Sequence, residues 1–129
     1  MAVQRQTGAQ NDAKPTVGDL RQKLYRFAKR VPYAGHPGSG FALCGAGQLA
    51  AGVIEEGKNA PQHTSVATGN QLKVVCGAPV AAGTRIASDA NGEAITAVAG
   101  AEVLGQSINA TAVAGEMLEI EFNPSGPMA

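Results

Sequence analysis

The sequence predicts an all-β protein, a small β-barrel or β-tulip-like sandwich, with an extended N-terminal arm and one short helix. Three observations favour this class. Residues 71–95 read as three short strands separated by two turns. Residues 117–122 alternate so that Leu118, Ile120 and Phe122 share one face, as in a half-buried strand. The chain of 129 residues has 17 Gly and no Trp, so its core is modest and contact with other subunits is expected to supply part of its stability. A small β-domain that stands alone is the other reading.

Residues 1–40 are predicted to form a basic arm. Residues 1–38 carry seven basic and two acidic side chains, a net charge of +5, whereas residues 39–129 carry three basic and eight acidic ones, a net charge of −5. A basic arm on an acidic body suits steering toward an acidic surface or toward a neighbour's acidic body. A solvated tail has the same composition.

Residues 16–30 predict the short helix. Thr16 and Asp19 have the spacing of a capping box, and Leu20, Leu24 and Phe27 recur on one helical face. Pro32 ends the pattern, and residues 31–40, rich in Gly and Pro, predict a linker. The apolar face would dock either on the protein's own barrel or on another protein. The candidate partner-binding residues are the basic and apolar side chains of the arm: Arg5, Lys14, Leu20, Arg21, Lys23, Leu24, Arg26, Phe27, Lys29 and Arg30.

Residues 41–123 are predicted to form the β-barrel body, and residues 124–129 a polar tail. Weak strand patterns at residues 41–44 and 48–55 precede a clearer one at 63–68. The letters DANG at residues 89–92 predict a hairpin turn, because Asn-Gly tolerates the positive φ that tight hairpins need. A faint internal similarity relates residues 52–64 to residues 105–118 and would suit two similar hairpins, although it does not establish a repeat.

No catalytic, cofactor-binding or metal-binding set emerges, and an enzyme is not expected. The two His and two Cys residues have long, irregular spacings, and neither a dinucleotide fingerprint nor a phosphate-binding loop is present. Paired glutamates such as Glu119 and Glu121 read as a solvated strand face. No apolar run is long enough to span a membrane, and no secretory signal is seen. Cys44 and Cys76 are expected as reduced, packed thiols, with a disulfide left open.

The run KVVCGAPVAAGTRIASDANGEAITAV, followed by VLGQSINATAVAGEMLEIEF, resembles the capsid decoration (cement) proteins of tailed bacteriophages. The shared pattern is G-x-x-V-x-A-G-x-x-I, then D-A-N-G, then V-x-G and A-x-A-G-E-x-L-x-I, within residues 45–122. The basic arm lies outside this resemblance and departs from the family.

The resemblance implies a virion protein on the outer capsid surface, made in the bacterial host cytoplasm. Its implied partner is the major capsid protein, whose subunits it would bridge and stabilise, and self-association as a trimer or another ring is expected. No membrane partner or cofactor is implied. The alternative is a nucleic-acid or anionic-surface binding module that acts through the basic helix.

Overall fold

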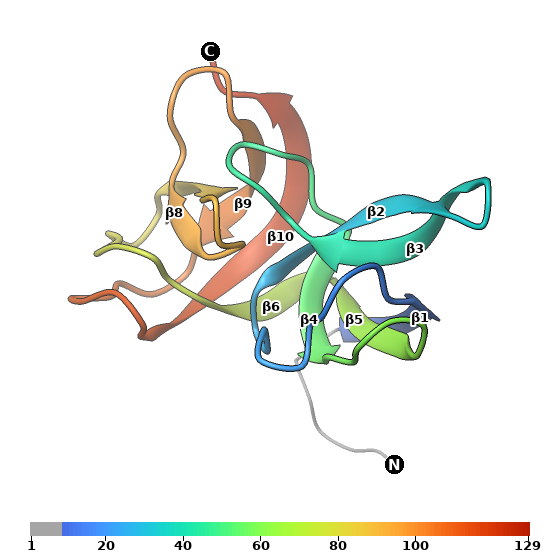
Figure 1. Cartoon of the computed structure of the whole chain (residues 1–129). Helices are drawn as coiled ribbons and strands as arrows, with labels where there is room; N and C mark the ends of the chain where they lie inside the picture. The colour runs from blue at the N-terminus through green and yellow to red at the C-terminus, as the bar shows by residue number, and fades with distance from the viewer. Residues whose placement is uncertain (1–8) are drawn as a thin grey trace.

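Ten strands form two antiparallel sheets in the computed structural model, which describes residues 9–129 (Figure 1). The first sheet contains β1 (Ala9–Pro15), β2 (Phe27–Tyr33), β3 (His36–Leu43), β4 (Gly52–Glu56) and β5 (His63–Gly69), in the order β1-β5-β4-β2-β3. The second contains β6 (Gln71–Val75), β7 (Arg85–Ser88), β8 (Ala94–Thr96), β9 (Glu102–Ser107) and β10 (Met117–Pro127), in the order β6-β10-β9-β7-β8. The predicted all-β class is confirmed. No helix able to cross a membrane occurs in this part of the chain.

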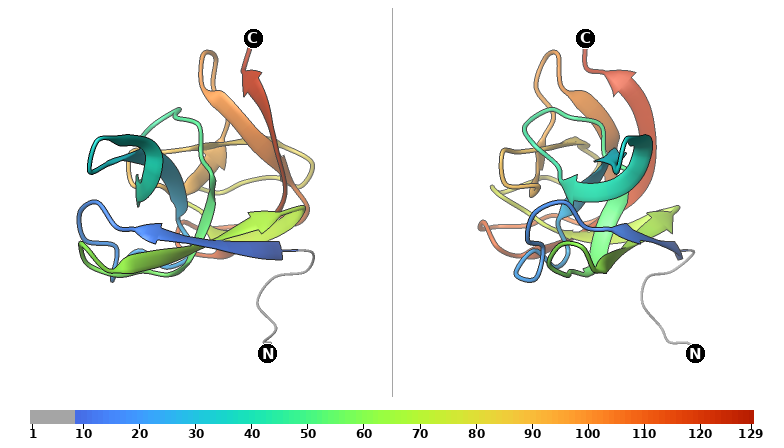
Figure 2. Two further views of the ribbon diagram at one scale, coloured as in Figure 1. Left: turned by 90° about the vertical axis from the view of Figure 1, so that its right-hand side faces the viewer. Right: turned by 45° about the vertical axis from the view of Figure 1, so that its right-hand side comes forward.

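The chain runs through the two sheets with the same topology. Strand β1 of the first sheet corresponds to β6 of the second, β2 to β7, and so on to β5 and β10. Asn70 joins the two halves of the chain. Each sheet brings its outer strands together through one parallel bridge, Thr16 to Phe41 in the first and Cys76 to Ala94 in the second. Figure 2 shows the arrangement from two further directions, with the first sheet in blue to green and most of the second in yellow to red. The faint sequence similarity falls on matching hairpins, β4–β5 and β9–β10, so the chain path is repeated where the sequence only hints at it.

The cores explain why the first sheet is difficult to recognise in the sequence. Ala28, Phe41, Ile54 and Val66 pack with Leu20 on one of its faces. A second cluster lies between the sheets: Phe27, Val53 and Ala67 of the first sheet meet Leu72, Ile86, Leu104, Leu118 and Ile120 of the second. In β2, β4 and β5, consecutive residues such as Val53 and Ile54 are therefore buried on opposite faces of the first sheet. Strands covered on both sides lose the polar–apolar alternation that identifies a half-exposed strand.

The predicted helix at residues 16–30 is wrong, because contacts with distant strands replace local ones. The backbone N–H groups of Leu20 and Tyr25 donate to the carbonyls of Lys58 and Ile54, at 2.9 and 2.8 Å. Tyr25 has a positive φ of 59°, outside the right-handed helical region. Leu20 and Phe27 are buried, but in different cores, so one helical face does not describe them. Propensity is a weak prior, and tertiary hydrogen bonds override it here.

The structure also does not support an extended arm, a linker or a polar tail. β1 pairs with β5 along its whole length, from Ala9–Gly69 to Pro15–His63. The segment read as a linker forms the end of the β2–β3 hairpin, where Ala34 and Gly35 both have positive φ, as a tight hairpin turn requires. β10 continues through the predicted tail to Pro127, opposite Glu102 of β9. Gly and Pro often mark loops, but in β3 and β10 several of them lie inside paired strands.

The clearest sequence patterns are confirmed. Residues 71–95 contain β6, β7 and the start of β8, and Gly92 closes the DANG turn with a φ of 73°. The Asp89 carboxylate accepts hydrogen bonds from the backbone N–H groups of Asn91 and Glu93, at 2.8 and 2.9 Å, which holds the turn closed. In β10, Leu118 and Ile120 are buried as predicted, and Phe122 is half-buried against the same core.

Candidate partner-binding surface

The ten predicted partner-binding residues fall into different surroundings. Arg5 lies outside the described residues. Leu20 and Phe27 are 2% and 0% exposed, so they serve the core and cannot touch a partner. The remaining residues form two separate basic groups. Arg21, Lys23, Leu24 and Arg26 belong to the loop between β1 and β2, whereas Lys14, Lys29 and Arg30 lie on β1 and β2.

In the loop group, the arginine charges are largely neutralised. The Arg21 guanidinium donates to both carboxylate oxygens of Asp19, at 2.9 and 2.7 Å. These hydrogen bonds lower the pKa of Asp19 to about 2. Arg26 forms an ion pair with Glu93 at 3.5 Å. Leu24 is exposed beside them, and it lines, together with Val75, a shallow hollow of about 220 Å³.

In the strand group, cations outnumber carboxylates. Lys14 and Arg30 both lie 3.6 Å from a single carboxylate oxygen of Asp12. The same two cations stand near the ring of Phe41, 6.0 and 5.8 Å from its centroid. The Lys29 ammonium donates to the side-chain carbonyl of Gln48 at 2.8 Å, an acceptor that carries no charge. This group therefore keeps an excess of positive charge at the surface.

A hollow of about 330 Å³ lies beside the strand group; we call it the basic groove. It is lined by Lys29, Arg30, Gln48, Leu49, Ala50 and Ala51. This lining combines aliphatic side chains with two cations and contains no carboxylate. The groove therefore combines positive charge with aliphatic surface.

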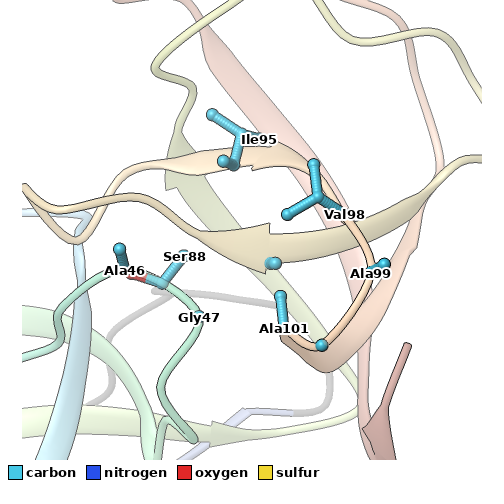
Figure 3. Close-up of a pocket in the computed structure, with 9 residues that line it drawn as sticks. Ala46, Gly47, Ser88, Ile95, Val98, Ala99 and Ala101 are labelled. Carbon is cyan, nitrogen blue, oxygen red and sulfur yellow. The ribbon is translucent and has the colours of Figure 1, made fainter. Parts of the chain in front are cut away.

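A second hollow, of about 390 Å³, lies where the chain between β3 and β4 crosses the second sheet (Figure 3). Figure 3 shows Ile95 and Val98 bordering it, with the Ala46–Gly47 segment opposite. The Gly47 N–H donates to the Ser88 carbonyl at 2.9 Å, and the Gly47 carbonyl accepts from the Glu102 N–H at 3.0 Å, so the crossing segment is held to the sheet. The lining contains no ionisable side chain. Sequence reasoning missed this apolar groove, because runs of Ala and Gly carry no periodic signal.

The two cysteines, considered above as possible reactive or metal-binding groups, are packed inside the protein. Cys44 and Cys76 are buried free thiols, and each donates to a backbone carbonyl, that of Gln48 at 3.4 Å and that of Val113 at 3.3 Å. Burial raises the pKa of Cys44, which disfavours the reactive thiolate. Among residues 9–129, no three His, Cys, Asp or Glu side chains gather in a way that could hold a metal ion.

No protein-family model and no curated protein matches the sequence. Among solved structures, the chain is similar to the N base of the head fiber gp8.5 in bacteriophage phi29. The superposition has a TM-score of 0.74 and covers 94% of this chain and 99% of that one, at 12% sequence identity. At this identity the likeness shows a shared fold: two five-stranded sheets are arranged in space as in the base of that head fiber.

Proposed function

We propose that this chain is a structural protein of a tailed-phage head that binds the outer surface of the capsid. The observation that carries the proposal is the fold likeness to a head fiber base over almost the whole of both chains. The motif resemblance to capsid decoration proteins in residues 45–122 supports the same class independently of the fold. On this proposal the protein is made in the host cytoplasm and resides in the virion.

The proposed mechanism is adhesive, and no bond is made or broken. Each copy bridges neighbouring subunits of the major capsid protein, and many weak contacts repeated over the lattice add up through multivalency. The exposed side chains of the two basic groups supply charged contacts, and the apolar groove supplies apolar ones. Self-association as a trimer or another ring remains part of the proposal, since the bulky core residues are few.

The nucleic-acid alternative relied on a basic helix, and residues 16–30 form a loop and a strand instead. Two of the loop cations are also neutralised by carboxylates. Binding to a polyanion is expected to weaken steeply as salt rises, because counterions are released. Mixed polar and apolar docking on a protein shell weakens less.

The test is co-sedimentation of the protein with expanded, empty heads of its phage prepared without it, at low and high salt. Saturable binding that survives high salt and raises the melting temperature of the heads supports the proposal. Absence of binding to heads, together with salt-sensitive retention of DNA, contradicts it. Deleting residues 1–38 is not a usable control, since this removes β1 and β2 from the first sheet.

A further inference from the structure

We propose that the basic groove binds an acidic segment of the partner protein, one in which a carboxylate stands next to an aliphatic side chain. The inference rests on the proposed function, since it specifies the chemistry of the capsid segment that docks.

The groove exists because β2 and β4 separate early. They pair only at Phe27–Val53 and Ala28–Gly52, while β2 continues to Tyr33 alongside β3. The chain before β4 is drawn away toward the second sheet by the two backbone hydrogen bonds of Gly47. The space left between β2 and residues 48–51 is the groove. Its backbone frame is therefore set by the packing of the two halves.

Charge points to an acidic occupant. The Lys29 ammonium donates to the uncharged side-chain amide of Gln48, and Arg30 shares the Asp12 carboxylate with Lys14. The loop group differs, because Arg21 and Arg26 each have a carboxylate partner of their own. An arriving carboxylate gains most beside cations that are not already neutralised, and Arg also binds carboxylates in a planar, two-pronged geometry.

The aliphatic part of the groove lining favours a partner segment that carries an aliphatic side chain next to the carboxylate. Leu49 lines the groove and is 55% exposed. It continues into the small side chains of Ala50 and Ala51. Covering Leu49 with an apolar group removes its surface from water, which is favourable wherever the match in shape is good.

The backbone of β2 limits how the segment can bind. The Ala51 N–H donates to the Ala28 carbonyl at 2.7 Å, so the peptide groups of Ala28 and, two residues on, Arg30 face the groove. The next residue on that edge, Pro32, has no N–H to donate. An extended partner segment can pair with Arg30 alone and cannot continue along β2 as an added strand. Recognition of the partner segment therefore depends on side-chain contacts and not on a long series of backbone hydrogen bonds.

The test uses the full chain and a capped five-residue peptide of alternating Leu and Glu, followed by NMR amide shifts. The peptide is expected to shift the amides of β2 and residues 48–51. The variant K29Q/R30Q should weaken its binding about tenfold, and L49A should weaken it in the same direction. The matched control R21Q/K23Q removes the same charge from the loop group and should change binding less than about twofold. Peptides with Gln for Glu, or Ser for Leu, should bind more weakly than the parent.

Several outcomes overturn the inference: no shift at millimolar peptide, shifts centred on the loop group or the apolar groove, or equal loss in both double variants. Head co-sedimentation separates this proposal from the proposed function. If K29Q/R30Q binds heads as tightly as the unmodified protein does, the groove assignment fails while the function stands. If the unmodified protein does not bind heads but the peptide occupies the groove, the function fails and the groove assignment stands.

Discussion

Replacement of Gly52 or Gly105 by Ala should destabilise the protein to a similar degree, because the two glycines hold matching places in the repeated path. Gly52 lies opposite Ala28 of β2, and Gly105 lies opposite Ile86 of β7. A Cβ added at Gly52 would meet the carbonyl oxygen of Ala67 well under 3.0 Å, and one at Gly105 would meet that of Glu121 equally closely. Neither glycine has a positive φ, so crowding alone decides the outcome.

The magnitude follows from the displacement needed. Moving the neighbouring strand by about 1 Å stretches ladder hydrogen bonds beyond the ~3.2 Å at which they are effective. Overpacking costs about 1–3 kcal/mol and each weakened hydrogen bond up to about 1 kcal/mol. The loss of chain entropy in the unfolded state offsets about 0.4–1 kcal/mol. The expected net loss is about 2–3 kcal/mol for each variant, or about 10 °C in melting temperature for a domain of this size.

The assay is urea unfolding followed by far-UV circular dichroism, at one fixed protein concentration because self-association would add to stability. Gly45→Ala is the control, since the nearest atoms to its added Cβ belong to the movable end of the Gln48 side chain. Its cost should stay below about 1 kcal/mol. The reasoning is refuted if either G52A or G105A is as stable as the unmodified protein, or if only one of the two is destabilised.

Three further results are expected. The Arg21 hydrogen bonds lower the pKa of Asp19 from the ordinary 3.8 to about 2 in the folded chain, so the unfolded state binds more protons between these values. Its contribution to stability should fall as the pH drops from about 4 toward 2, and D19N should flatten that part of the curve; unchanged curves would contradict this. The buried thiols of Cys44 and Cys76 should resist a thiol reagent at pH 8 in the native protein and react after denaturation. Rapid labelling of either thiol in the native protein would contradict this expectation. Thr16→Val should cost about 1–3 kcal/mol in urea unfolding, since the buried Thr16 hydroxyl bonds the Gln62 carbonyl and the Thr64 hydroxyl; a neutral substitution would show that these bonds contribute nothing net.

In the second half of the chain, β6 and β10 were predictable because buried and more exposed residues alternate along them. In β10, Leu118 and Ile120 face the core while Glu119 and Glu121 face outward, and the period of two is visible in the sequence. The DANG turn was equally clear, since Asn-Gly has few other uses between strands. Local chemistry and tertiary structure agree here, so the sequence alone identifies the elements.

Residues 16–40 were mispredicted, because their contacts are with distant parts of the chain. The pattern from Leu20 to Phe27 suits a helix, but the two side chains enter different cores and the intervening backbone bonds to distant strands. The partner-binding prediction shared this fault: it ranked residues by charge and helical face. Leu20 and Phe27 then proved to be buried, and the cations separated into one neutralised and one under-neutralised group.

The sequence by itself determined that the chain is built from short strands with glycine turns, that its charge is divided between its two parts, and that it resembles capsid decoration proteins. The tertiary structure alone decided that the basic part supplies strands to the first half of a repeated fold, and where grooves open on the surface. Strand pairing is non-local: a residue such as Gly52 has its role set by Ala28 and Ala67, which no local pattern can name. A groove likewise depends on where paired strands part, and it is defined only when both halves are packed.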